Sequence, residues 1–345
     1  MDHVDDRERK TAGGDEARQQ KTALVKPEDL KAGGFIPQRQ PGKITIRCKA
    51  PGGRLTSERL VRIAEVARRY GQGIVHLSVR MSPEIPYVDL ADLETVVREL
   101  GDVGQEIASC GRRFRVSTAC AGCEYNPNGL TDTQELARAA TQRFFGQDMP
   151  HKFKTCFAGC VRDCVRCRMA DLGFQGMVRP KLVAENCTHC GLCVRSCQDQ
   201  ALAMGSDELP VRDLSRCISC GDCIKACPFE AMMAEEIGHG IFAGGKHGKH
   251  PHTAYPVAEF VPDEQVMDAI ETTMNWYWEH GKPGERLGNV LDRVGVDPYR
   301  SALREVVGDR LLTARDLAQP KWRRIFYAGL AETFPAYREV GEQER

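Results

Sequence analysis

The stretches CTHCGLCVRSC at 187–197 and CISCGDCIKACP at 217–228 are the most specific motifs of this chain. In each, the cysteines follow the spacing CxxCxxCxxxC. Three thiolates in a tight loop of this kind hold one four-iron cluster, and the fourth reaches across to a second cluster. Gly191 and Gly221 stand where the loop backbone must approach the sulfur atoms closely. We therefore expect two [4Fe-4S] clusters and a role in electron transfer.

The crossed ligand pattern divides eight cysteines into two sets. The first set is Cys187, Cys190, Cys193 and Cys227, and the second is Cys217, Cys220, Cys223 and Cys197. A pair of structural zinc sites built from CxxC hooks is the alternative interpretation. The complete tandem run and Pro228 favour a two-cluster bacterial ferredoxin domain, which we place at 184–238.

The composition excludes several functional classes. The 345 residues are 41% hydrophobic and 28% charged, and 48 Lys and Arg balance 48 Asp and Glu. This balance leaves no overall basic field for nucleic acid, and no apolar run is long enough for a membrane span. The 16 cysteines are grouped too closely for ordinary disulfides. We expect a cytoplasmic redox protein that binds no nucleic acid and has no membrane span.

Hydrophobic periodicity predicts an α+β unit after a polar tail. We expect a disordered tail at 1–41 and, within 42–110, strands at 43–48 and 73–79 with helices at 57–70 and 90–100. Residues 131–145 should form a helix opened by a capping box of Thr131 and Gln134. Further predictions are a strand at 151–158, a Gly- and His-rich loop at 238–252, and helices from 263 onward.

A second set of cysteines lies outside the ferredoxin runs. Cys120 and Cys123 belong to TACAGC, and Cys160 and Cys164 belong to GCVRDC. Two such pairs can supply four thiolates to a third site, and the spacing leaves zinc and a third cubane open. The remaining cysteines are interpreted as small buried hydrophobic residues. They are Cys48, Cys110, Cys156 and Cys167.

The surroundings of this second set resemble a known family. The markers are VHLSVR, FRVSTAC, the TDT helix start, KFKT, GC followed after two residues by DC, MADLG and GGKHGKHP. In this order they resemble the siroheme-dependent sulfite and nitrite reductases, most closely the catalytic subunit of anaerobic sulfite reductase and the dissimilatory sulfite reductase subunits. The resemblance implies a ferredoxin-like half-domain at 42–110. It also implies a siroheme and [4Fe-4S] domain at 111–183 and 239–345, interrupted by the ferredoxin insert.

The resemblance also implies ligands for siroheme and its coupled cluster. Cys160 and Cys164 match the family's CxxxC pair, Cys164 being the residue that bridges cluster and siroheme iron, and Cys120 matches the first cysteine. The family usually separates its first pair by five residues, where this chain has Asn126. We predict that Cys123 serves as the fourth ligand after a local rearrangement of the loop.

Cationic side chains complete the implied site. The resemblance places Arg80, Arg115, Lys152 and Lys154 around the substrate, and strand alternation puts the two lysines on one side of their strand. Siroheme carries eight carboxylates, and a loop of flexible glycines and cations suits them. The loop residues are Gly244, Gly245, Lys246, His247, Lys249 and His250. The alternatives are solvated surface charges and, for the loop, a linker or metal-scavenging segment.

The function implied is the six-electron reduction of sulfite to sulfide, with siroheme and three [4Fe-4S] clusters as cofactors. Nitrite reduction to ammonia by the same cofactors is one alternative, and a siroheme-free polyferredoxin subunit that relays electrons is another. The sequence shows no nicotinamide or flavin fingerprint, so an electron-donor protein or subunit is expected. Full-length relatives contain two such halves, which implies a homo- or hetero-oligomer.

Overall fold

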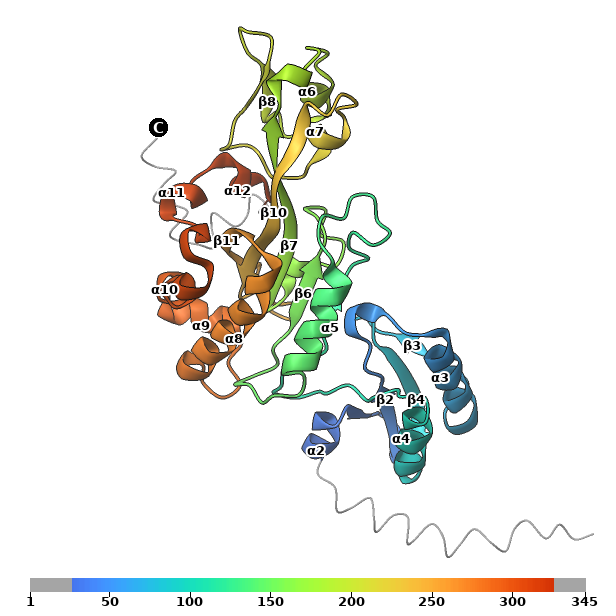
Figure 1. The fold of residues 1–345 in the computed structure, drawn as a ribbon. Helices are drawn as coiled ribbons and strands as arrows, with labels where there is room; N and C mark the ends of the chain where they lie inside the picture. The colour runs from blue at the N-terminus through green and yellow to red at the C-terminus, as the bar shows by residue number, and fades with distance from the viewer. Residues whose placement is uncertain (1–26, 326–345) are drawn as a thin grey trace, which may run out of the picture.

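The N-terminal lobe is an antiparallel four-stranded sheet with helices packed against it (Figure 1). The computed structural model of the protein describes residues 27–325. The strands lie in the order β1-β2-β4-β3, and alternate residues such as Ile44 and Ile46 are buried in a core shared with the helices. The elements are α2 (Pro27–Ala32), β1 (Phe35–Pro37), β2 (Lys43–Arg47), η1 (Pro51–Gly53), α3 (Ser57–Tyr70), β3 (His76–Leu77), β4 (Pro83–Asp89), η2 (Leu90–Asp92) and α4 (Leu93–Gly101).

Two features of this lobe differ from the expectation. The predicted disordered tail is wrong for residues 27–37, because α2 forms there and β1 pairs with β2; residues 1–26 lie outside the described residues. The predicted strand at 73–79 is reduced to two residues, and β4 was not expected. The sequence pattern does not predict this strand because it contains Pro83 and Pro86, and proline argues against a strand.

The main lobe is built on a five-stranded mixed sheet. Its strands lie in the order β11-β10-β7-β6-β5, with β5, β6 and β7 parallel and the other two antiparallel. Aromatic residues such as Phe153, Phe157 and Tyr277 form one core between sheet and helices. The elements are β5 (Thr118–Ala119), α5 (Thr133–Phe144), β6 (Thr155–Ala158), η3 (Cys167–Met169), β7 (Leu172–Leu182), β10 (Met232–Ala243), β11 (Tyr255–Val261), α8 (Asp263–His280), α9 (Leu287–Val294), α10 (Val296–Val307), η5 (Gly308–Arg310), α11 (Ala314–Leu317) and α12 (Pro320–Ile325).

The long strand pair β7 and β10 carries the insert at its far end (Figure 1). Between them lie η4 (Ala184–Asn186), α6 (Leu192–Ser196), β8 (Leu202–Met204), β9 (Pro210–Arg212) and α7 (Asp222–Lys225). The loop predicted at 238–252 is wrong over its first part, because residues 238–243 belong to β10 and are buried. Gly238 abuts the Phe260 backbone, so a glycine-rich strand packs here where side chains would not fit.

The helices expected in the main lobe are confirmed, with one change in capping. α5 begins after Asp132, whose side chain accepts from the backbone N–H of Glu135 at 3.0 Å. The predicted capping box of Thr131 and Gln134 is therefore wrong. Gln134 instead donates to the carbonyls of Gly52 and Cys120, and so joins the two lobes. Between residues 27 and 325, no helix is both long and apolar enough to cross a bilayer.

A glycine contact on β7 yields a prediction about stability. A methyl group on Gly176 would lie 2.4 Å from the Gly159 carbonyl oxygen, so Gly176→Ala should destabilise the fold by about 1–3 kcal/mol. Gly101, in helix α4, has nothing within 4 Å of such a methyl group. Gly101→Ala is therefore a matched control, with a stabilisation of about 0.4–1 kcal/mol. Denaturation midpoints of the anaerobically purified variants would check both, and an unperturbed Gly176→Ala would contradict the close packing.

Candidate functional site

A cavity of about 450 Å³ opens between the two lobes. Arg80 lies in the turn before β4, and Lys154 immediately precedes β6. Cys164 and Arg166 lie in the cysteine loop after β6. His247 reaches the cavity from the loop after β10. We call this cavity the basic pocket. The structure thus brings together four of the residues predicted from sequence, namely Arg80, Lys154, Cys164 and His247.

Lys152 and Lys154 lie just before β6, on either side of Phe153, which forms an isolated β-bridge with Phe114. The strand predicted at 151–158 is therefore confirmed only over Thr155–Ala158. Phe153 is fully buried in the main core, while the two lysines beside it are half-buried. The backbone N–H of Lys154 donates to Asp171 at 3.0 Å. Burial and the charge of Arg80 lower the pKa of Lys154 to about 8. The pKa of Lys152 is also lowered, by burial and by Arg286.

The two predicted arginines differ in their surroundings. Arg80 is half-buried and donates to the backbone carbonyl of Val116, and burial and the nearby Arg115 lower its pKa to about 10. Arg115 is 7% exposed and does not line the basic pocket. Its guanidinium donates to the carbonyls of Ser109 at 2.9 Å and Gly111 at 3.0 Å. Arg115 therefore acts on the pocket through its charge.

A buried ion pair behind the pocket was missed by the sequence reasoning. Asp171 is fully buried and Arg286 is 8% exposed, and an Arg286 guanidinium nitrogen lies 2.7 Å from the carboxylate. His151 lies near the same charges, and burial and Lys152 lower its pKa to about 4. Asp171 is part of the MADLG marker and so carried a weak signal. Arg286 is 115 positions further along the chain and carried none.

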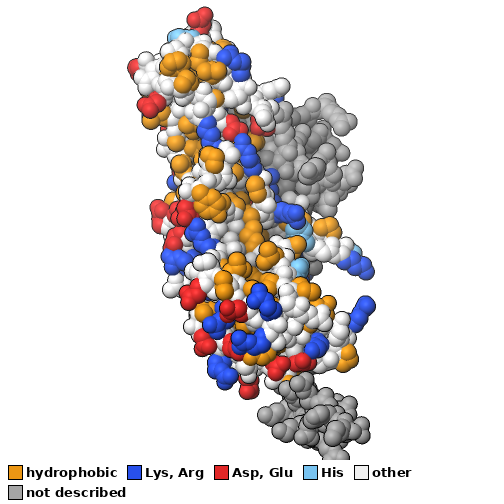
Figure 2. All heavy atoms as spheres, turned by 90° about the vertical axis from the view of Figure 1, so that its right-hand side faces the viewer, with side chains coloured by type: hydrophobic (Ala, Val, Ile, Leu, Met, Phe, Trp, Pro, Cys, Tyr) orange, Lys and Arg blue, Asp and Glu red, His pale blue; other side chains and the backbone are white. Residues whose placement is uncertain are grey.

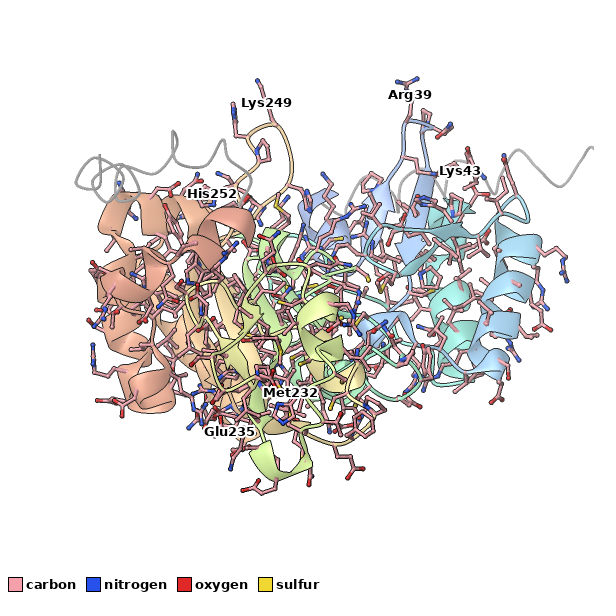
Figure 3. The ribbon with its side chains drawn as sticks, turned by 90° about the horizontal axis from the view of Figure 1, so that it is seen from above. Arg39, Lys43, Met232, Glu235, Lys249 and His252 are labelled. Carbon is pink, nitrogen blue, oxygen red and sulfur yellow. The ribbon has the colours of Figure 1, made fainter. Side chains whose placement is uncertain are left out.

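The loop predicted to bind siroheme splits into two parts. Gly244 and Gly245 are buried, and a methyl group on Gly245 would lie 2.5 Å from the Ala170 carbonyl oxygen, so both glycines serve backbone packing. The Lys246 ammonium group donates a hydrogen bond to the side-chain oxygen of Asn289. Lys249 and His250 are exposed, and Figure 3 shows Lys249 projecting from the body on the same side as Arg39. Of these six residues, only His247 lines the basic pocket.

The cysteines of the second set lie in different surroundings, and a backbone contact places Cys120 beside Cys160. The Cys120 thiol accepts from the backbone N–H of Gly159 at 3.1 Å, which places it beside buried Cys160. Cys164 is exposed in the basic pocket. Cys123 is exposed, and its backbone N–H donates to Thr131. The side chain of Asn126 accepts from the Asn128 backbone in a local turn.

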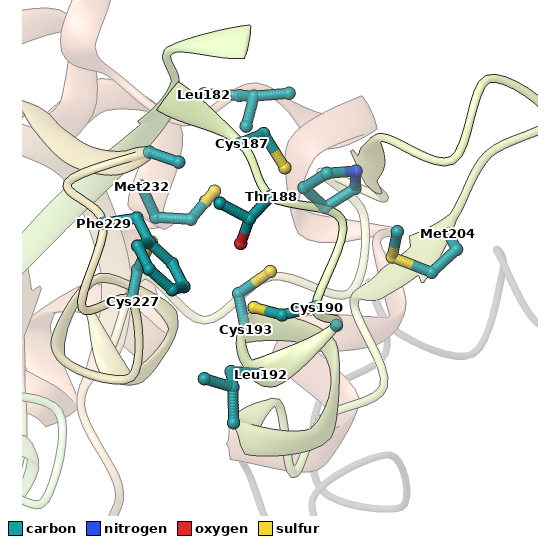
Figure 4. A pocket seen from close by; sticks show the side chains of 13 residues that line it. Leu182, Cys187, Thr188, Cys190, Leu192, Cys193, Met204, Cys227, Phe229 and Met232 are labelled. Carbon is teal, nitrogen blue, oxygen red and sulfur yellow. The ribbon is translucent and has the colours of Figure 1, made fainter. Parts of the chain in front are cut away.

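In the insert, the eight cysteines line two separate small cavities. Cys187, Cys190, Cys193 and Cys227 line the first cavity, which we call the outer site (Figure 4). Cys197, Cys217, Cys220 and Cys223 line the second, which we call the inner site. Gly191 (φ 68°) and Gly221 (φ 79°) adopt the left-handed conformation that begins each short helix.

Each of these cavities is lined by four cysteines, and thiolates are the ligands that hold iron–sulfur clusters. Among residues 27–325, no three His, Cys, Asp or Glu side chains converge closely enough to hold one metal ion. The Cys190 thiol is moreover stabilised as thiolate, since the backbone N–H of Leu192 lowers its pKa.

The four remaining cysteines are buried, as expected, but one makes a polar contact. Cys48, Cys156 and Cys167 are at most 2% exposed, and burial raises the pKa of Cys48 and Cys156 to about 12. Cys110 is also buried, yet its sulfur accepts from the Arg47 guanidinium at 2.9 Å. The interpretation of Cys110 as a simple apolar residue is therefore incomplete.

Comparisons with known proteins agree with this architecture. The chain is 32% identical over 277 residues to the coenzyme F420-dependent sulfite reductase of Methanocaldococcus jannaschii, covering 79% of this chain and 44% of that one. It is 33% identical to a subunit of the anaerobic sulfite reductase of Salmonella typhimurium, covering 47% of this chain and 51% of that one. The chain thus spans about half the length of these two curated relatives. A crystal structure of dissimilatory sulfite reductase I matches 85% of this chain and 75% of that chain, with a TM-score of 0.65 and 22% identity, and so shows the fold.

Two family descriptions cover most of the described residues. Residues 36–103 match the nitrite/sulfite reductase ferredoxin-like half domain. Residues 110–311 match the nitrite and sulphite reductase 4Fe-4S domain, and this match spans more than half of the chain. The basic pocket, the cysteines that surround it and the two larger sheets, apart from Phe35 at the start of β1, fall within these matches. The chain therefore belongs to the nitrite and sulphite reductase family.

Proposed function

We propose that the chain is a siroheme-dependent sulfite reductase whose basic pocket binds siroheme and substrate. The observation that carries the proposal is the exposed Cys164 thiol in a pocket lined by Arg80, Lys154 and Arg166. Burial and the neighbouring charge of Arg80 lower the pKa of Lys154 to about 8, so two of these cations repel each other. A polyanionic ligand would offset this repulsion.

The residues of the pocket fit the proposed group. Arg166, Lys246 and His247 would pair with carboxylates of siroheme, and Cys164 would be its link to a cluster. When bound, siroheme would supply an iron that binds the substrate anion and conducts electrons to it. The proposed coupled cluster uses Cys120, Cys123, Cys160 and Cys164. With the inner and outer sites, this makes three [4Fe-4S] clusters.

The chain's own side chains would bind the anion and supply protons. Reduction of sulfite to sulfide takes six electrons and six protons and removes three oxygens. Arg80 offers a planar fork for an oxyanion, while Lys154 with its lowered pKa releases a proton more readily than an ordinary lysine. Arg115 and Lys152 would add positive charge that stabilises the anion as its S–O bonds break.

Sulfite is favoured over nitrite as the substrate. Both relatives described above are named sulfite reductases, although the family includes nitrite reductases. The basic pocket also favours a catalytic protein over a siroheme-free relay subunit. Steady-state rates of the anaerobically purified protein with each anion would decide the substrate, and a faster rate with nitrite would reverse this assignment.

The proposal includes two kinds of protein partner. A separate protein would donate electrons. A second copy of the chain or a related subunit would pair with it beside the basic pocket, where Leu77 and Val79 are 68% and 96% exposed. Such exposed apolar side chains at the rim of a site suit a protein contact. A monomeric mass of the holoprotein by light scattering would contradict the pairing.

The cofactor content tests the proposal directly. Protein purified without oxygen from a siroheme-producing host should show a siroheme absorption band and about thirteen irons per chain, about twelve from three cubanes and one from siroheme. Cys164→Ser should lose the siroheme band while the eight insert cysteines keep their clusters. About eight irons and no tetrapyrrole in the wild type would overturn the catalytic proposal. A retained siroheme band in the variant would overturn the role of Cys164.

Lys154 is expected to control the pH dependence of turnover. With a pKa of about 8, Lys154 is protonated below that pH and loses its charge above it, so the rate should fall as pH rises through 8. Lys154→Ala should lower kcat by about 100-fold or more, with both cofactor types retained. Lys154→Arg should shift the falling limb to higher pH. Lys43→Ala, which removes a surface lysine paired with Asp89, is the control, and equal rates for control and Lys154→Ala would exclude Lys154.

The fourth ligand of the coupled cluster can be identified by iron counting. Cys123→Ser should lower the iron content and alter the spectrum of the siroheme-coupled cluster, because Cys123 would supply its fourth thiolate. Asn126→Ala should leave the iron content unchanged, since the Asn126 side chain is used in a turn. The reverse result would show that the loop rearranges and that Cys123 is not a ligand.

A further inference from the structure

We propose that electrons enter this chain at the outer site and leave the insert through the inner site. This inference rests on the proposed function and assigns an order to its clusters. The two cysteine runs have the same spacing, so the sequence treats them as equivalent. The contacts of the two sites with the rest of the molecule differ, and these contacts set the order.

The inner site touches both loops that carry the second cysteine set. Asp222, between Cys220 and Cys223, lies 3.4 Å from the guanidinium of Arg162, which stands between Cys160 and Cys164. Lys225, on the same short helix α7, donates to the side chain of Asn128 at 2.8 Å. Asn128 belongs to the loop that follows Cys123. Both cysteine loops around the proposed coupled cluster are thus tied to the inner site.

Strand β7 provides a second, independent connection. Gly176 packs against Gly159, the residue before Cys160. Two residues further along, Val178 packs against Gly221, and its backbone N–H donates to Ser219 at 3.0 Å. Residues two apart in a strand point to the same side and are roughly 7 Å apart. A short, buried stretch of one strand therefore separates the coupled cluster's loop from the inner site.

The outer site lies further from this centre. Its cavity is lined by Leu182, at the end of β7, which is four residues beyond Val178 and so roughly 13 Å further along the strand. Cys190 is exposed, and the lining residues Met204 and Phe229 are 39% and 47% exposed. Figure 4 shows these side chains around the cysteines, and Figure 2 shows exposed hydrophobic atoms at the insert's end of the molecule.

Distance and exposure together give the direction of flow. Electron tunnelling slows exponentially with distance, so the coupled cluster would exchange electrons with the inner site faster than with the outer one. A donor protein can approach the outer site most closely, because its cysteine loop and apolar rim face solvent. Each electron would oxidise the donor, reduce the outer cluster, and then pass through the inner cluster to the centre beside the basic pocket.

A matched pair of variants tests this order in the full chain. Cys190→Ala and Cys220→Ala change equivalent positions of the two runs, and each should lower the iron content through damage to one insert cluster. With all clusters reduced, the spin relaxation of the siroheme-coupled cluster is measured by electron paramagnetic resonance. Dipolar coupling falls with the third power of distance. Cys220→Ala should therefore abolish most of the relaxation enhancement, and Cys190→Ala should leave most of it intact.

The outcomes separate this inference from the proposed function. A loss of enhancement in Cys190→Ala, with none in Cys220→Ala, would overturn the order while leaving the reductase intact. A wild type without siroheme or a coupled-cluster signal would overturn the proposed function and this inference with it. If either alanine variant fails to fold, Cys190→Ser and Cys220→Ser keep an oxygen ligand, and the same order is read from which serine variant changes the relaxation.

Discussion

The buried carboxylate of Asp171 is the contact on which the proposed active site depends. Its oxygens accept from the Lys154 backbone N–H and from the guanidinium of Arg286, and its backbone carbonyl accepts from the N–H of Gly244 at 2.8 Å. One residue thus ties the start of β6, the start of α9 and the loop after β10 to the start of β7. Burial raises the pKa of Asp171, and the Arg286 charge opposes that rise. Removing either partner would leave a buried charge uncompensated.

The same ion pair explains how a crowded set of cations can exist in one pocket. Arg80, Lys154 and Arg115 repel one another, and their pKa values are lowered, with burial as the largest cause. Such a site is costly to fold around unless the carbonyl acceptors of Arg115, the Asp171 carboxylate and an anionic ligand share the charge. The proposed affinity of the pocket for anions would be strongest at low pH, where Lys154 carries its full charge.

The local parts of the structure were predictable and the long-range parts were not. Helices α3 and α8 and strand β2 follow from periodicity, because each buries one face with the spacing that its geometry requires. Strand β4 was not predicted because Pro83 and Pro86 argue against a strand. The end of β10 was not predicted because its glycines are typical of a loop. Both are held by strands on either side, which a single-sequence pattern does not reveal.

The same division holds within the candidate site. Lys154, Cys164 and Arg80 lie on motifs that the family resemblance supplied, and the structure brings them to one cavity. Arg166 and Arg286 enter the site through folding alone. Gly244 and Gly245, which are predicted to bind siroheme, are also needed for close backbone packing. A glycine-rich sequence indicates close approach, but the approaching group is identified by the fold.

The insert between β7 and β10 shows how a fold can place two copies of a repeated motif in different surroundings. The two cysteine runs are interchangeable by spacing, and each pairs three thiolates with one from the other run. The two runs differ in their surroundings because the strand pair β7 and β10 meets the insert at one end only. Val178 meets the inner site two residues after Gly176 meets the Cys160 loop, so a single strand fixes both contacts. A shift of this strand by one residue would turn Gly176 and Val178 to the other face and break both contacts at once. The register of β7 against β10 therefore couples the fold of the main lobe to the path that electrons would take.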